Sequence, residues 1–96
     1  MIRVIIERQL KPGRFDEYAT IIRRAKKEAT RKPGFMGGEL YFDMDDKNKI
    51  FIIAAWDNLE NWNLWDASDE RKALTQELSP IMEGAEKIKI LKSSRI

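Results

Sequence analysis

The stretch that decides the fold runs from Asn48 to Trp65 and reads NKIFIIAAWDNLENWNLW. From Ile50 to just before Asp57 every residue is apolar, and successive side chains of a strand point to opposite faces. A strand with one face in water alternates apolar and polar residues, so this run predicts a strand that is covered on both faces. Trp62 follows, three positions before Trp65, at the spacing of one helical face. We therefore predict a doubly covered strand that leads into a helix carrying two indoles.

The composition indicates one small globular domain. The chain has 96 residues, and a chain of this length buries roughly 60–65% of its unfolded surface, which is enough for one modest core. Its 18 basic and 16 acidic residues are interspersed and leave a net charge of only +2. A nucleic-acid-binding surface needs a basic stripe, which this pattern lacks. We expect no nucleic-acid partner.

Two residue types are missing from the sequence. Without cysteine there is no disulfide framework and no thiolate chemistry, which is compatible with the cytoplasm. Without histidine the chain lacks the commonest general base near neutral pH and the commonest metal ligand. The longest apolar run is far too short to span a bilayer, and the N-terminal MIRVIIERQL carries charges inside its only candidate signal segment. We expect a cytoplasmic protein with no membrane partner and no metal.

Apolar periodicity and turn residues predict the other elements. In chain order they are a strand over 2–10, a helix from 14 to a stop at 33–34, a strand over 35–44, the central strand, a short helix to about 67, a helical segment from 68 and a strand over 86–92. The order βαββαβ predicts a ferredoxin-like α+β fold, with one antiparallel sheet and the helices on one face. We expect a single domain over residues 1–92 and a short tail over 93–96.

Two local signals sharpen this prediction. Asp57 or Asn58 begins the short helix, and Glu60 lies where a capping-box partner of Asp57 would lie. The pair Gly37-Gly38 inside a strand predicts a bulge or a close approach to the backbone.

A sheet with helices on one face leaves its other face bare. Ile5, Phe51, Ile53 and Ala55 would form a contiguous apolar patch there. A second copy of the same sheet would cover that patch, so we predict an isologous homodimer through the sheet face. The alternative is a monomer whose outer strand face stays half exposed.

Several segments resemble one known family. They are PG at 12–13, PGF at 33–35, AAW at 54–56 and LENWNLWDASDERKAL from Leu59. In this order on a βαββαβ frame they are similar to the antibiotic biosynthesis monooxygenase family of dimeric α/β barrels. The resemblance implies a sheet-to-sheet dimer and a small-molecule cavity in each subunit, between the sheet and the helices.

The heme-degrading branch of that family uses an Asn on the first strand, a Trp on the second helical region and a His after it. Trp65 matches the family Trp, whereas the His position falls at or near Thr75 and the Asn position at or near Ile6. The iron ligand is therefore missing, and the chain has no His or Cys to replace it. We expect no cofactor and no heme degradation; a heme enzyme with an unusual ligand stays a third alternative.

The resemblance also points to pocket residues. We expect Ile6, Tyr18, Ile22, Trp62 and Trp65 to line the cavity, and packing in an ordinary core is the alternative for each of them. Phenol or quinol oxygenation needs a group that takes a proton or stabilises an anion. The candidates near strand ends are Glu7, Arg8, Glu39 and Tyr41. Glu39 or Tyr41, on the glycine-containing strand, is preferred, and an exposed or interface strand residue is the alternative.

The sequence therefore predicts a cofactor-independent monooxygenase for a small electron-rich aromatic compound, such as a quinol or an anthrone. A non-catalytic ligand-binding or accessory dimer on the same fold is the alternative, because the histidine base is missing. Asp43, Asp45 and Asp46 form a solvated hairpin rather than a calcium loop, because the loop lacks the required Gly and Glu.

Overall fold

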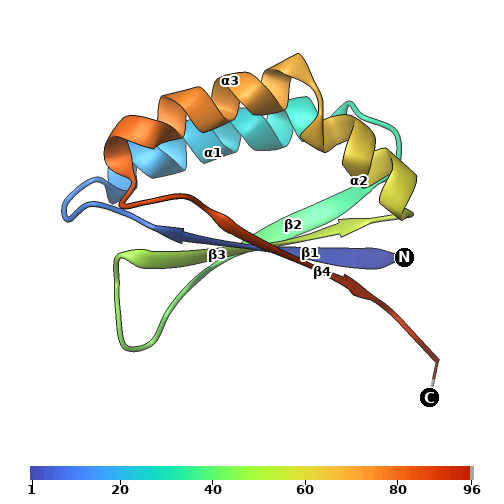
Figure 1. Cartoon of the computed structure of the whole chain (residues 1–96), viewed down its shortest axis with the longest axis horizontal. Coiled ribbons are helices and arrows are strands. Elements are labelled where there is room, and N and C mark those ends of the chain that lie inside the picture. Colours follow the sequence, from blue (N-terminus) through green and yellow to red (C-terminus); the bar gives the residue numbers. More distant parts are fainter. Residues whose placement is uncertain (96) are drawn as a thin grey trace.

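A computed structural model describes residues 1–95 of the chain. Its elements are β1 (Ile2–Gln9), α1 (Phe15–Thr30), β2 (Phe35–Phe42), β3 (Lys49–Trp56), α2 (Leu59–Asp66), α3 (Asp69–Leu78), a 3-10 turn η1 (Ser79–Ile81) and β4 (Lys87–Lys92). The strands form one antiparallel sheet in the order β2-β3-β1-β4. The helices lie together over one face of that sheet (Figure 1). The predicted ferredoxin-like α+β fold is confirmed.

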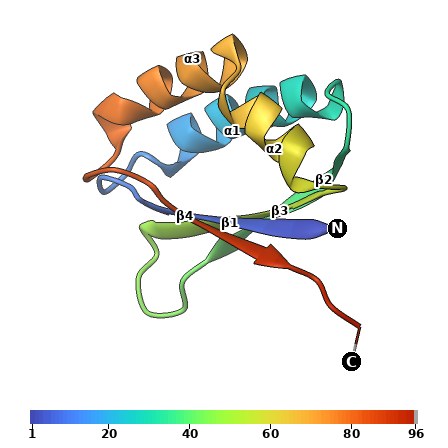
Figure 2. The same ribbon diagram turned by 45° about the vertical axis from the view of Figure 1, so that its right-hand side comes forward.

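The central strand β3 has the two apolar faces that the sequence predicts. Ile50, Ala54 and Trp56 are buried beneath the helices. The alternate residues Phe51 and Ile53 are half-buried, on the face with no helical cover (Figure 2). The chain therefore covers only one side of its most apolar strand.

The core consists of two apolar clusters on the helical side of the sheet. One gathers Ile2, Val4, Ile6, Ala29, Ala54, Trp56, Trp62 and Trp65. The other gathers Leu10, Tyr18, Ile21, Ile50, Leu74, Leu78 and Ile81. Truncating a buried aromatic to alanine typically costs about 3–5 kcal/mol, so the tryptophans of the first cluster make up much of what holds α2 on the sheet.

Helix caps explain where α2 and α3 begin. The side chain of Asn58 accepts a hydrogen bond from the backbone N–H of Asn61 at 2.8 Å, so Asn58 is the cap of α2. The predicted capping box of Asp57 with Glu60 is wrong, because Asp57 Oδ1 instead accepts from Asn61 Nδ2 at 2.9 Å. In the same way Ser68 is the cap of α3, because its Oγ accepts a hydrogen bond from the backbone N–H of Arg71.

The glycine pair in β2 forms the predicted bulge. The pairing of β2 with β3 shifts register between Phe35 and Gly38, and Gly37 has a φ of +113°. At the tail, Ser93 donates hydrogen bonds to the carbonyl of Met1, while Ile96 of the predicted tail lies outside the described residues. None of the helices within residues 1–95 is both long and apolar enough to cross a membrane.

Candidate functional site

A cavity of about 310 Å³ lies between the sheet and the helices. Most of the surface that lines it is apolar, from residues such as Ile6, Ala19, Leu40, Ile52 and Leu74. The backbone of β2 borders it at Gly38, where an added Cβ would lie 3.7 Å from the Cβ of Ala54. Its volume is at the lower end of the range for small-molecule sites, and its lining is of the kind that such sites have.

Four of the five predicted pocket residues line this cavity: Ile6, Ile22, Trp62 and Trp65. The fifth, Tyr18, does not line it. Tyr18 is fully buried in the second core cluster, where its hydroxyl accepts a hydrogen bond of 2.9 Å from Arg8 Nη1. The structure therefore brings the predicted set together except for Tyr18, which contacts Arg8 but does not line the cavity.

Trp56, Trp62 and Trp65 make an aromatic wall on one side of the cavity. The ring centroid of Trp56 lies 6.1 Å from that of Trp62, edge to face, and 6.4 Å from that of Trp65, stacked. Phe35 adds an edge contact to Trp56 at 5.2 Å. Such pairs hold one another's orientation, so the wall is rigid and suited to a flat ligand.

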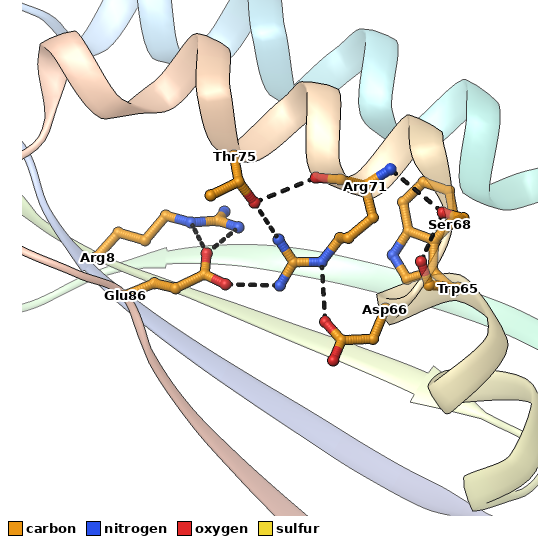
Figure 3. Close-up of polar contacts among 7 residues, drawn as sticks. All are labelled: Arg8, Trp65, Asp66, Ser68, Arg71, Thr75 and Glu86. Carbon is orange, nitrogen blue, oxygen red and sulfur yellow. Dashed lines mark hydrogen bonds and ion pairs between the residues drawn. The ribbon is translucent and has the colours of Figure 1, made fainter.

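Two buried arginines belong to the lining of this largely apolar site. Arg8, on β1, and Arg71, on α3, both line the cavity, and only 2% and 3% of their surfaces are exposed. They meet at one carboxylate, that of Glu86, which comes just before β4 (Figure 3). Arg8 donates to Glu86 Oε1 from Nη2 at 2.9 Å and from Nε at 3.1 Å. Arg71 Nη2 donates to Glu86 Oε2 at 2.7 Å.

Further contacts fix the orientation of Arg71. Its guanidinium carbon lies 5.8 Å from the ring centroid of Trp62, a cation–π distance. Its Nη1 donates to Thr75 Oγ1 at 3.3 Å, and its Nε lies 3.6 Å from Asp66 Oδ1 (Figure 3). The backbone N–H of Arg71 is bound by the capping residue Ser68. Arg71 is thus held against the aromatic wall by both its main chain and its side chain.

Burial and the charges of this cluster together shift the pKa values of two groups in opposite directions. Burial raises the pKa of Glu86, but the hydrogen bond from Arg71 and the charges of Arg8 and Arg71 outweigh it and leave the pKa below its ordinary value. Burial raises the pKa of Tyr18 above its ordinary value, although the charge and hydrogen bond of Arg8 oppose it. Glu86 is therefore ionised, and Tyr18 neutral, near neutral pH.

Glu39 and Tyr41 do not reach into the cavity with their side chains. In the sheet they are paired with Ile53 and Phe51, whose side chains lie on the face away from the helices. Tyr41 there donates a hydrogen bond of 2.7 Å to Glu39 Oε2, which raises the pKa of Tyr41. Glu39 borders the cavity, but its carboxylate lies on the same side of the sheet as Ile53, which no helix within residues 1–95 covers.

The antibiotic biosynthesis monooxygenase model matches residues 1–77 of the chain. The chain belongs to the antibiotic biosynthesis monooxygenase family. Its fold is that of this monooxygenase type, and no curated protein sequence matches the chain closely enough to count as a relative.

Solved structures share this family fold over almost the whole chain. A conserved protein from Methanosarcina mazei Go1 has a TM-score of 0.88 at 19% identity and covers 97% of this chain and 92% of its own. An antibiotic biosynthesis monooxygenase has a TM-score of 0.85 at 16% identity, with 99% and 100% covered. The N63A mutant of SnoaB, a cofactor-independent oxygenase from Streptomyces nogalater, has a TM-score of 0.85 at 15% identity, with 99% and 94% covered. At these identities the likeness shows the fold alone.

Thr75 lies at or near the position that the resemblance aligns with a heme-ligating His. The hydroxyl of Thr75 accepts a hydrogen bond from Arg71 Nη1 and donates to the carbonyl of Arg71 at 3.1 Å. Ile6, at or near the aligned Asn position, is an apolar part of the cavity lining. Within residues 1–95 no three Asp, Glu, His or Cys side chains gather as a metal site would require.

Sequence reasoning named Arg8 as a candidate near a strand end but missed Arg71, Glu86 and the cluster that the three residues form. A signal for Arg8 exists, because it continues the inward series Ile2, Val4 and Ile6 along β1. Arg71 likewise keeps helical spacing with the buried Leu74 and Leu78. A charged residue at a core-facing position indicates a paired, buried charge. No sequence pattern singles out Glu86, since it lies in an irregular segment.

Proposed function

We propose that this chain is a cofactor-independent monooxygenase that acts on a small electron-rich aromatic compound of the quinol or anthrone kind. The observation that carries this proposal is the cavity of about 310 Å³, walled by Trp56, Trp62 and Trp65, between sheet and helices of a monooxygenase-family fold. A flat ring system fits such a wall, because stacked aromatic surfaces exclude water and hold the ring in one orientation.

The reaction would need no redox group from the protein. In an anthrone, the ring CH₂ becomes C=O as one oxygen atom of O₂ is added to the carbon and the other leaves as water. The four electrons that reduce O₂ come from the substrate. The protein's contribution is to orient the ring and to stabilise the negative charge that develops on its oxygen. SnoaB, a protein of the same fold, is a cofactor-independent oxygenase.

Oxygen consumption by chelator-treated protein with dithranol, an anthrone, tests this function. Uptake above the protein-free rate is expected, and Trp65→Ala should lower it about tenfold or more because the ring is no longer held. Leu64→Ala is the matched control, since Leu64 is the preceding residue of the same helix and is 64% exposed. Protein-independent uptake, or equal loss in both variants, would contradict the proposal.

A non-catalytic ligand-binding or accessory role is the second candidate. The charged lining of the cavity favours this role. It consists of basic side chains and Glu39, and the side chain of Glu39 lies on the face of the sheet away from the cavity. No carboxylate side chain on the described part of the chain therefore faces the cavity as a base. Tight binding of dithranol without oxygen uptake would support this role over the oxygenase.

We further propose that the working unit is a homodimer joined through the open sheet face, in the cytoplasm. Ile5, Ile53, Phe51 and Ala55 lie together on that face, because Ile5 pairs with Ile53 across the β1–β3 ladder. On β4, Leu91 pairs with Arg3 and so lies on the same open face as Ile5, where it is 44% exposed. A second copy would bury these side chains.

A further inference from the structure

The charged side chains at the cavity are strongly unbalanced in sign. Arg8, Arg23, Lys26 and Arg71 all line it, and among residues 1–95 the only acidic lining residue is Glu39. The carboxylate of Glu39 lies on the other face of the sheet, hydrogen-bonded to Tyr41. A ligand in the cavity therefore meets basic side chains from both the sheet and the helices. Neither of these layers presents a carboxylate to it among the described residues.

The excess of positive charge is greatest among the buried side chains. Arg8 and Arg71 are both almost fully buried, and Glu86 is the carboxylate that they share (Figure 3). Asp66 is the other carboxylate near Arg71, but it lies 3.6 Å away, and its side chain is 48% exposed, so solvent screens its charge. Two buried cations thus share one half-buried anion. Such an arrangement carries a large desolvation cost that a further anion would offset.

The guanidinium groups also have unused donor capacity. Each guanidinium has five N–H donors. Within residues 1–95, Arg8 uses three of them, toward Glu86 and the hydroxyl of Tyr18. Arg71 uses two in hydrogen bonds, toward Glu86 and Thr75. The orientation of each group is already fixed by these partners, so a ligand oxygen would meet donors that are held in place before it binds.

We propose that the cavity takes a flat apolar molecule that carries an anionic oxygen, with its rings on the Trp62–Trp65 wall and its charge against Arg8 and Arg71. The shared chemistry is a carboxylate or an ionised phenol on an aromatic ring. The proposal rests on the proposed function, because it concerns the same cavity, and it makes a claim about charge that the oxygenase assignment alone does not. Glu86 is a positioning residue here, since it orients both arginines.

The wild-type protein allows a test that needs no variant. Isothermal titration compares 2-naphthoate with 2-naphthamide, which has nearly the same shape and no charge. Hydrogen bonds to charged groups are stronger than neutral ones, so naphthoate should bind about tenfold or more tightly. In a second arm, 4-nitrophenol is titrated from acid to alkaline pH, and its absorbance should show ionisation at a lower pH when bound than when free. The two arms distinguish a carboxylate from a phenolate.

Three variants then locate the charge. Arg71→Gln should remove most of the anion preference while 2-naphthamide binding stays within about twofold, because the aromatic wall is intact. Glu86→Gln should tighten naphthoate binding about threefold or more, because it removes the competing carboxylate and keeps an acceptor oxygen. Lys27→Gln is the control. It removes an exposed cation of α1 that does not line the cavity, and salt screens its charge, so it should leave the preference intact in 0.5 M NaCl.

The proposal is overturned if neither anion binds more tightly than its neutral counterpart, or if a folded Arg71→Gln protein keeps the full preference. Circular dichroism establishes which variants are folded, and if Arg71→Gln is not, the wild-type comparison decides alone. The outcome is separable from that of the proposed function. Anion preference without oxygen uptake refutes the oxygenase and supports the ligand class. Oxygen uptake with no preference for the anionic form supports the oxygenase and refutes the ligand class.

Discussion

Arg71 on α3 donates a hydrogen bond of 2.7 Å from Nη2 to Oε2 of Glu86, in the segment that leads into β4. This one contact ties the helical layer to the edge of the sheet. Because Glu86 also accepts two hydrogen bonds from Arg8 on β1, a single carboxylate connects three parts of the fold. The stability of the fold and the charge of the cavity therefore depend on the same residue.

Replacing Glu86 with alanine should destabilise the protein by about 3–5 kcal/mol, because it leaves two buried cations without their shared carboxylate. Urea unfolding followed by circular dichroism measures this free energy. Glu83→Ala is the control, since Glu83 is an exposed carboxylate three residues earlier and should change the stability by less than about 0.5 kcal/mol. Similar losses in both variants would contradict the role of Glu86.

The pKa of Glu86 also predicts a pH dependence of stability. Its folded-state pKa is lowered from the ordinary value of 4.5. A group with a lowered folded pKa binds more protons when unfolded, so its contribution is fully present above about pH 4.5 and is lost as the pH falls through the folded value. The urea midpoint of the wild-type protein should therefore fall more steeply between pH 5 and pH 3, the range set by that ordinary value, than that of Glu86→Gln. Parallel curves would show that Glu86 is not responsible.

Tyr18→Phe should cost about 1–3 kcal/mol of stability, because it removes the hydroxyl that accepts a hydrogen bond from the buried Arg8. Tyr41→Phe makes the same chemical change at a residue that is 44% exposed, and its expected cost is less than about 0.5 kcal/mol. Urea unfolding of the two variants gives the comparison. If the costs are equal, the Arg8–Tyr18 contact contributes nothing specific.

Ile53→Lys should convert the proposed dimer into a monomer, because it places a charge at the centre of the open sheet face. Size-exclusion chromatography with light scattering measures the mass of each species. Leu64→Lys introduces the same charge at an exposed position on α2 and should leave the dimer intact. A wild-type protein that is monomeric at micromolar concentration would refute the dimer directly.

Gly34→Ala should lower the stability through two effects, which are backbone strain and a steric clash of the added Cβ. Gly34 has a φ of +85°, and an added Cβ would lie 2.1 Å from Asp57 Oδ1. Gly13→Ala is the matched control, since Gly13 has a φ of +77° and an added Cβ would meet nothing within 4 Å. Gly13→Ala should cost roughly 1 kcal/mol from backbone strain, and Gly34→Ala clearly more. Thermal unfolding of both proteins distinguishes the two effects.

The sequence by itself determined the order of the elements and the two-faced character of β3. These features are local, because strand alternation, helical spacing and Pro-Gly stops each depend on fewer than about twenty neighbouring residues. The cavity itself was expected only from the family resemblance, and the four pocket residues that line it lie on the inner faces of their elements. The choice between Asp57 and Asn58 as the helix cap was not predictable, because both side chains can accept the same hydrogen bond.

Only the tertiary structure decided that Arg8 and Arg71 of the cavity lining meet at Glu86. Arg8 and Glu86 are 78 positions apart in the chain, and Arg71 and Glu86 are 15 apart. No local pattern specifies such a contact, because the cost of burying each charge depends on whether a distant opposite charge arrives at the same place. The packing of α3 over β1, with the return of the chain into β4, brings them together and sets the charge of the site.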